Sequence, residues 1–271
     1  MERRGFCLTN QVVSQGRPAL REELSATFCK WQASSSRRDS FLLPSAHRRH
    51  SARMRLTMTN YLDVISSWCF WATPAWQELQ DQYRDSVDFR WKIALMDKAG
   101  LPPTREHTEW YYRRSGMLMR SPVRLSAAWV EAGAAEYLAP NCTAEAARDF
   151  GVEDDRVWIA LSRAELLESQ KIARWEIAAE IAARAAEIDA RKLLERAQSP
   201  EIEARVRQST AEFHALQVTQ RPTFVIDTPI GDRAVFSGFA KAAPMAATID
   251  AMLDDIAGYR AHAAHFGESP P

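Results

Sequence analysis

The sequence has few cysteines, and none are spaced as a metal site or a dithiol redox centre requires. The four are Cys7, Cys29, Cys69 and Cys142. No two of them are separated by two residues, so the chain lacks the Cys-x-x-Cys pair of zinc sites and of disulfide-exchange centres. Four unpaired cysteines also argue against a disulfide scaffold. We therefore expect no metal site, and any redox chemistry would have to use a single thiol.

Other absences limit the classes of partner. The formal net charge is zero, from 35 basic and 35 acidic side chains, which gives no sign of nucleic acid binding. No apolar run approaches the roughly 18 residues of a membrane-spanning helix, so we expect no membrane partner. Glycine-rich nucleotide-binding motifs are also missing. An apolar content of 46% and a charged content of 26% are typical of a soluble globular protein.

The first 53 residues differ in composition from the rest of the chain. They carry a net charge of +6, which the remaining residues balance. Their richness in Arg and Ser is typical of an organelle transit peptide, but they have no continuous apolar core like that of a secretory signal. Because apolar periodicity is missing too, we interpret residues 1–53 as a basic, disordered extension or as an over-long start before Met54 or Met58. Without a secretory signal, we expect a cytoplasmic protein.

Apolar patterns predict one α/β domain that is interrupted by a long insertion. We expect residues 54–100 and 221–260 to form this domain together, and residues 261–271 to be a flexible tail. The order of its elements is strand–helix–strand before the insertion and strand–strand–helix after it. These elements are predicted at residues 60–65, 68–83, 87–96, 223–227, 234–236 and 243–257.

The predicted insertion, residues 101–220, shows helical patterns and no convincing strand. Its clearest helical pattern runs over residues 163–198, where isoleucines recur on one face. Ser199 and Pro200 end this pattern, and another helix is predicted over residues 201–216.

The segment Asp63–Trp71 contains a Ser-x-x-Cys motif, Ser66 to Cys69, between a predicted strand and a predicted helix. Ser is a common N-cap, and a lone Cys is often a small buried apolar residue. A helix N-terminus, however, directs unpaired N–H groups and the positive end of the helix dipole at one spot, which favours a thiolate. The Ser66 hydroxyl cannot exchange disulfides. It can donate a hydrogen bond to a thiolate that another molecule supplies, contributing about 1.5–3 kcal/mol.

This motif, the order of the elements and the run Arg221–Ile226, Arg-Pro-Thr-Phe-Val-Ile, together resemble the DsbA-like branch of the thioredoxin superfamily. The resemblance implies an α/β, thioredoxin-like fold with a central mixed sheet, here with a long all-helical insertion. It also implies that Pro222 follows a cis peptide bond and faces the motif. Two kinds of relative share Ser at the first motif position, with a turn that reads Asp-Val-x-Ser-Pro-Tyr-Ser. They are the kappa-class glutathione transferases and the 2-hydroxychromene-2-carboxylate isomerases.

The resemblance further implies a co-substrate and a set of site residues. Glutathione would supply the thiol, Ser66 and Cys69 would be catalytic, and the protein would be a homodimer. The Arg221 backbone would pair with glutathione like an added strand, and its guanidinium would hold a substrate carboxylate. The sequence departs from the relatives in having Ser67 where they have Pro, and in lacking an Asp beside Ser237. The residues expected to bind glutathione or substrate are Ser67, Trp68, Arg221, Pro222, Thr223, Ser237 and Gly238.

Three functions fit these observations. The first is a glutathione-dependent transferase or cis–trans isomerase that acts on a small-molecule electrophile. The second is a DsbA-like thiol oxidoreductase that works through Cys69 alone. The third is a non-catalytic thioredoxin-fold module that binds a peptide across Pro222. We interpret His107 and His214 as ordinary residues. Five aromatic residues either line a substrate pocket or belong to the core: Trp68, Trp71, Trp76, Tyr111 and Tyr112.

Overall fold

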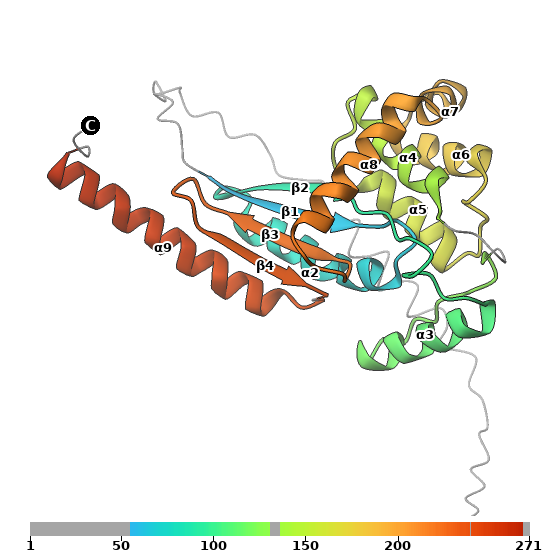
Figure 1. Ribbon diagram of the computed structural model, residues 1–271, viewed down its shortest axis with the longest axis horizontal. Coiled ribbons are helices and arrows are strands. Elements are labelled where there is room, and N and C mark those ends of the chain that lie inside the picture. The colour runs from blue at the N-terminus through green and yellow to red at the C-terminus, as the bar shows by residue number, and fades with distance from the viewer. Residues whose placement is uncertain (1–54, 131–135, 239, 268–271) are drawn as a thin grey trace, which may run out of the picture. The chain divides into compact units, whose positions relative to one another are not determined.

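A four-stranded mixed sheet forms the centre of the part of the chain that the computed structural model describes, residues 55–130, 136–238 and 240–267 (Figure 1). Its strand order is β2-β1-β3-β4. β1 pairs in parallel with β2 and antiparallel with β3, and β3 pairs antiparallel with β4, as a hairpin. The strands are β1 Leu56–Leu62, β2 Val87–Ile93, β3 Thr223–Asp227 and β4 Arg233–Ser237.

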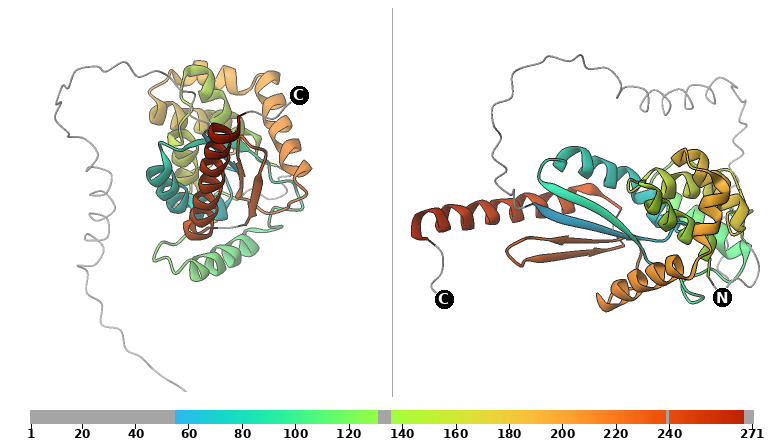
Figure 2. Two further views of the ribbon diagram at one scale, coloured as in Figure 1. Left: turned by 90° about the vertical axis from the view of Figure 1, so that its left-hand side faces the viewer. Right: turned by 90° about the horizontal axis from the view of Figure 1, so that it is seen from above.

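Helices cover both faces of the sheet (Figure 2). α2 (Ser67–Tyr83) and α9 (Ala242–Phe266) pack against each other on one face, and α8 (Pro200–Ala215) contacts β2 from the other. Residues of β3 alternate between these faces. Phe224 lies in the main core, where it stacks on Trp76 of α2, whereas Val225 packs with Phe213 of α8.

Within the described residues, the predicted insertion contains helices and the loops that join them, and no strand. The expectation of one helical pattern over residues 163–198 is wrong, because the chain breaks it twice. The backbone takes a left-handed conformation at Ser169 (φ 60°) and again at Glu187 (φ 59°), which ends α6. The helices before α8 are α3 Arg105–Leu118, α4 Leu138–Ala146, the short 3₁₀ helix η1 Ala147–Phe150, α5 Arg156–Leu166, α6 Trp175–Ala186 and α7 Ala190–Ala197.

Two predicted boundaries also change. β1 ends at Leu62, not at residue 65, because Asp63 starts a turn in which its carbonyl accepts the Ser66 N–H. α9 continues to Phe266, so the predicted flexible tail is helical up to that residue, although Ile256 is the last buried residue of the helix (Figure 1). Residues 1–53 and 268–271, which carry the predicted extension and the end of the tail, lie outside the described residues.

None of the helices in the described ranges is long and apolar enough to span a bilayer.

Candidate active site

Ser66 is the N-cap of α2, as the motif predicts. Its backbone is extended (φ −75°, ψ 117°), and its Oγ accepts the Cys69 N–H at 3.3 Å. The Ser66 hydroxyl is also hydrogen-bonded with the Cys69 thiol, so its proton can be donated either to that sulfur or to a ligand. Ser66 itself is 6% exposed, but the next two residues, Ser67 and Trp68, are half-buried. A ligand can therefore approach the helix N-terminus over these two residues.

Cys69 lies behind the cap and is 4% exposed. Burial raises the pKa of its thiol to about 12, although hydrogen bonding with Ser66 lowers the pKa in part. The expectation that the helix N-terminus favours a thiolate is therefore wrong for Cys69, because desolvation outweighs the helix dipole. The sulfur of the motif is held as a neutral thiol.

Asp63 holds the turn that precedes the cap. This fully buried carboxylate accepts the N–H groups of Ile65 at 3.1 Å and Met96 at 2.7 Å, and the Asn141 side-chain amide at 2.8 Å. Asn141, from α4 of the insertion, also accepts the Val64 N–H at 3.1 Å. Asp63 belongs to the motif, and no role was predicted for it. Its role is to fix the main chain that leads to Ser66.

Pro222 lies at the same end of the sheet as Ser66. Tyr61 pairs with Thr223 across β1 and β3, so both strands reach the turn there. The Arg221–Pro222 peptide is cis, as the resemblance implies, and Pro222 is buried. In the described residues, neither the main-chain N–H nor the C=O of Arg221 has a main-chain partner. This backbone can pair with an added strand.

The Arg221 guanidinium is not free to hold a substrate carboxylate, which corrects the sequence-based expectation. Its Nε donates to the Ala94 carbonyl at 2.6 Å and its Nη2 to the Leu95 carbonyl at 2.5 Å. The group also lies 4.3 Å above the Phe213 ring. Arg221 therefore ties the cis-proline segment to the chain that follows β2, and its charge lowers the pKa of the nearby Cys69.

Thr223, Ser237 and Gly238 hold the segment around Pro222 in place. The Thr223 hydroxyl lies 2.7 Å from the Gln220 carbonyl and 3.1 Å from the Ser237 hydroxyl. The Gly238 N–H donates to the Pro222 carbonyl at 2.8 Å, with Gly238 at φ 75°, a conformation that glycine adopts readily. Their predicted contacts with glutathione stay predictions, but these residues have a structural role of their own.

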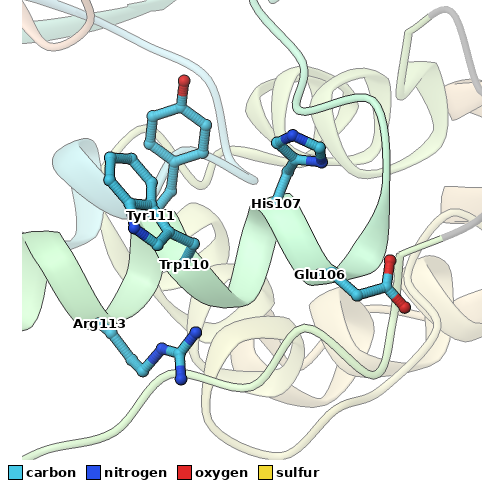
Figure 3. A pocket seen from close by; sticks show the side chains of 5 residues that line it. All are labelled: Glu106, His107, Trp110, Tyr111 and Arg113. Carbon is cyan, nitrogen blue, oxygen red and sulfur yellow. The ribbon is translucent and has the colours of Figure 1, made fainter.

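The five aromatic residues do not form one pocket. Trp71 donates to the Ser115 hydroxyl at 3.0 Å, and the fully buried Trp76 donates to Asp155 at 2.8 Å, so both belong to the core. Tyr111 is 43% exposed on α3. It lines an open hollow that contains none of the predicted site residues (Figure 3). The other residues of this hollow are Glu106, His107, Trp110 and Arg113.

Glu165 is a buried group that the sequence analysis missed. It is fully buried in α5, and neither of its carboxyl oxygens has a hydrogen-bond partner among the described residues. The signal was present in the helical spacing, because Trp158, Leu161 and Glu165 fall on one face of α5. A carboxylate on that face predicts either a specific partner or a functional role.

Within the described ranges, no cluster of His, Cys, Asp and Glu is suited to hold a metal ion.

Solved structures with the same arrangement of elements include the cytosolic disulfide reductase DsbM from Pseudomonas aeruginosa. The two chains are 17% identical, with a TM-score of 0.60 over 73% of this chain and 98% of that one. In the structure of DsbM with GSH, the chain is 15% identical to this one, with a TM-score of 0.58 over 73% of this chain and 99% of that one. Pseudomonas aeruginosa DsbA is 16% identical to this chain, with a TM-score of 0.50 over 82% of this chain and 92% of that one. At these identities the likeness shows the fold alone.

No curated protein matches the sequence. Residues 57–250 match the family of DSBA-like thioredoxin domains, which is more than half of the chain. The match spans β1, the Ser66 cap, the helical insertion, the cis-proline strand and much of α9. The chain therefore belongs to the DSBA-like thioredoxin domain family, with the thioredoxin-like α/β fold and helical insertion that its sequence predicted.

Proposed function

We propose that the protein is a glutathione-dependent enzyme that acts on a small electrophile, by group transfer or by cis–trans isomerisation. The observation that carries this proposal is the state of Cys69, whose thiol is buried and has a pKa raised to about 12. A serine occupies the other position of the motif. The reactive sulfur therefore comes from a ligand.

The N-terminus of α2 supplies what a bound thiolate needs. Unpaired N–H groups and the helix dipole favour negative charge there, and the Ser66 hydroxyl can donate its proton to sulfur. Among the described residues the Arg221 backbone has no main-chain partner, which supports binding of an extended tripeptide by strand addition. The description of DsbM with GSH, a relative by fold, agrees with this ligand. Glutathione is abundant in reducing compartments, which fits the proposed cytoplasmic location.

In the proposed chemistry, the glutathione S–H proton passes to solvent and the thiolate attacks an electrophilic carbon. In transfer, a C–S bond forms and the leaving group departs with its bonding electron pair. In isomerisation, addition to a conjugated carbonyl compound moves the π electrons to oxygen. Rotation about the new single bond and expulsion of the thiolate then give the other geometric isomer.

The second candidate, an oxidoreductase that uses Cys69 alone, is disfavoured by the same observation. At neutral pH, a thiol with a pKa of about 12 is thiolate in only about one molecule in 100,000. Disulfide exchange requires an accessible thiolate.

The proposal is tested by comparing Ser66→Ala with Ser199→Ala. Ser199 caps α8 and accepts the Ile202 N–H at 3.4 Å, so both substitutions remove one cap and should each cost about 1 kcal/mol of stability. Glutathione affinity is measured by calorimetry, and turnover by conjugation to 1-chloro-2,4-dinitrobenzene. Ser66→Ala alone should reduce kcat/KM, by roughly 10- to 150-fold for the loss of one charge-assisted hydrogen bond.

Three outcomes would contradict the proposal. If millimolar glutathione leaves the melting temperature of the wild-type protein unchanged, the protein does not bind glutathione at a relevant affinity. Binding without turnover of any electrophile supports the non-catalytic module. Equal effects of the two serine substitutions would reduce Ser66 to a structural cap.

A further inference from the structure

The helix α3 has its large apolar residues on the side that faces solvent. Its buried side chains are Thr108, Tyr112 and Ser115, and each of them carries a hydroxyl group. Large apolar side chains that are at least 40% exposed lie on its outer side and in the loop that follows: Trp110, Tyr111, Met117, Leu118 and Val123. A surface helix of a globular protein usually shows the opposite arrangement, with its apolar side against the core. The reversal indicates that the outer side of α3 meets another surface.

Exposed apolar side chains are concentrated in this part of the chain. In the ranges that the structure describes, nine large apolar side chains are exposed, and five of them fall within residues 110–123. Figure 3 shows the side chains of the first part of α3 radiating from the helix, so that they do not converge on one point. A broad surface fits this arrangement better than an enclosed small ligand does.

Positive charge accompanies the exposed apolar residues. Four exposed arginines that form no ion pair within the described residues lie among them: Arg113, Arg114, Arg120 and Arg124. Residues 105–124 contain five arginines and two glutamates, which gives a net charge of +3. The rest of residues 54–271 carries −9, because that range as a whole balances the +6 of residues 1–53. We call residues 105–124 the α3 surface, a basic and apolar area on an otherwise acidic part of the chain.

A membrane surface rich in anionic lipids matches this combination. Helices that lie in the plane of the lipid headgroups carry apolar and aromatic residues that insert, together with Lys or Arg that attract the lipid phosphates. Trp and Tyr are enriched at this depth of the bilayer. Anionic lipids repel the acidic remainder of residues 54–271, so the α3 surface is the side of this part of the chain that can approach them.

We propose that the α3 surface binds anionic phospholipid membranes, with Met117, Leu118 and Val123 inserted between the lipids and the arginines placed at the phosphates. An acidic protein would match the charge equally well. Docked peptides, however, occupy grooves or sheet edges, whereas these side chains project from a single helix. The expectation of no membrane partner rested on membrane-spanning runs alone, and surface binding needs none. The inference is independent of the proposed glutathione-dependent activity.

The test is sedimentation of the full chain with vesicles. Vesicles of equal parts phosphatidylglycerol and phosphatidylcholine supply the anionic surface, and vesicles of phosphatidylcholine alone are the comparison. We expect the wild type to sediment with the anionic vesicles and to stay in solution with the neutral ones. Raising the salt concentration from about 0.1 M to about 1 M should weaken the binding, because it screens the arginines.

The charge requirement is tested with Arg113→Gln/Arg114→Gln. This variant should weaken binding to the anionic vesicles by about 30-fold, at about fivefold for each arginine. The matched control is Arg184→Gln/Arg191→Gln, which removes two exposed arginines from α6 and α7, on the other side of the insertion from α3 (Figure 1). The control should bind like the wild type. An equal loss in both variants would mean that overall charge attracts the protein and would reject the α3 surface.

The apolar requirement is tested with Met117→Gln/Leu118→Gln, which should weaken vesicle binding by about tenfold or more. Tyr259→Gln/Phe266→Gln, which removes two exposed aromatic side chains from α9, is its matched control and should leave the binding unchanged. Circular dichroism verifies that every variant folds.

Three further results would overturn the inference. The first is no sedimentation of the wild type with anionic vesicles. The second is binding that survives both α3 variants, which would come from another basic part of the chain, such as residues 1–53. The third is a wild type that binds no vesicles but forms dimers in light scattering, and that becomes monomeric in Met117→Gln/Leu118→Gln. The α3 surface would then contact a second copy of the chain.

Discussion

Two buried carboxyl groups near the candidate site show how hydrogen bonding decides the cost of burial. Asp63 is fully buried, and desolvation raises its pKa, but the three hydrogen bonds that the carboxyl group accepts oppose that rise. Glu165 is equally buried and has none among the described residues. Asp63 therefore contributes to the local structure, whereas Glu165 costs stability whenever it ionises.

This contrast predicts a pH-dependent gain in stability for Glu165→Gln. The pKa of Glu165 in the folded protein is raised above its unfolded value, so the fold favours the neutral form. No cost exists below the unfolded pKa, and the cost grows as the pH rises above it. The melting temperature of Glu165→Gln should match that of the wild type near pH 4 and exceed it at pH 7–8, by about 2–4 °C per kcal/mol. Glu168→Gln, at the exposed site, should show no such gain, and a gain independent of pH would contradict the explanation.

The buried thiols predict slow cysteine chemistry in the folded protein. Burial raises the pKa of both Cys69 and Cys142 to about 12. In the double variant Cys7→Ser/Cys29→Ser, these two are the remaining thiols. At pH 8 and with Ellman's reagent, neither should react rapidly in the native protein, whereas both should react in urea. If one thiol per chain reacts rapidly with Ellman's reagent, and this reaction is lost when Cys69 is replaced, the result would instead support the single-thiol oxidoreductase.

At the scale of elements, Asp155 joins the thioredoxin-like part to the insertion. It precedes α5 and accepts side-chain N–H groups from Trp76 at 2.8 Å and Gln80 at 2.9 Å, both on α2, and from Trp158 at 3.0 Å. Asp155→Ala would leave these donors without an acceptor and should cost about 2–4 kcal/mol in urea unfolding. Asp154→Ala removes an exposed ion pair with Arg156 and a hydrogen bond from the exposed Arg156 N–H, and should cost about 1 kcal/mol. Equal effects of the two would contradict the linking role of Asp155.

The elements that sequence predicted well are those with local signals. Ser66 caps α2 by accepting the N–H three residues away, and Ser199 and Pro200 separate α7 from α8, as predicted. The breaks near Ser169 and Glu187 were missed, because helix ends of this left-handed kind usually carry Gly or Asn. Main-chain hydrogen bonds close both helix ends, from the Gln170 N–H to the Ala164 carbonyl at 2.8 Å and from the Ile188 N–H to the Ala183 carbonyl at 3.0 Å, and no residue type in the sequence marks them.

The candidate site was predictable in its location and not in its electrostatics. Spacing and motif placed Ser66, Cys69 and Pro222 at one end of the sheet. The pKa of the Cys69 thiol depends on burial. The hydrogen bonding of the Arg221 guanidinium depends on the Ala94 carbonyl, which lies 127 positions away in the sequence. Glu165 was detectable from its position on the apolar face of α5, but its missing partners become visible only when α3, α5 and the turn after β1 are assembled.

At the scale of the whole molecule, one continuous apolar core connects the described elements. The main cluster includes Leu56 of β1, Trp76 of α2, Leu161 of α5, Leu193 of α7 and Ile256 of α9. The sheet and the insertion therefore do not have separate cores. A helix of the insertion that loses its packing exposes apolar surface of α2 and of the sheet at the same time.

A shared core predicts that the insertion and the sheet unfold together, although chains of this length often populate intermediates. Urea titration followed by far-UV circular dichroism, which reports the helices, and by near-UV circular dichroism, which reports the packed tryptophans, should give coincident midpoints. Asp155→Ala should lower both midpoints equally, because Asp155 bonds to α2 from the start of α5. Separate midpoints, or a shift in only one signal, would show that the insertion is an independent unit. In that case the hydrogen bond from Ser162 of α5 to the Val64 carbonyl would not be what holds the turn before Ser66.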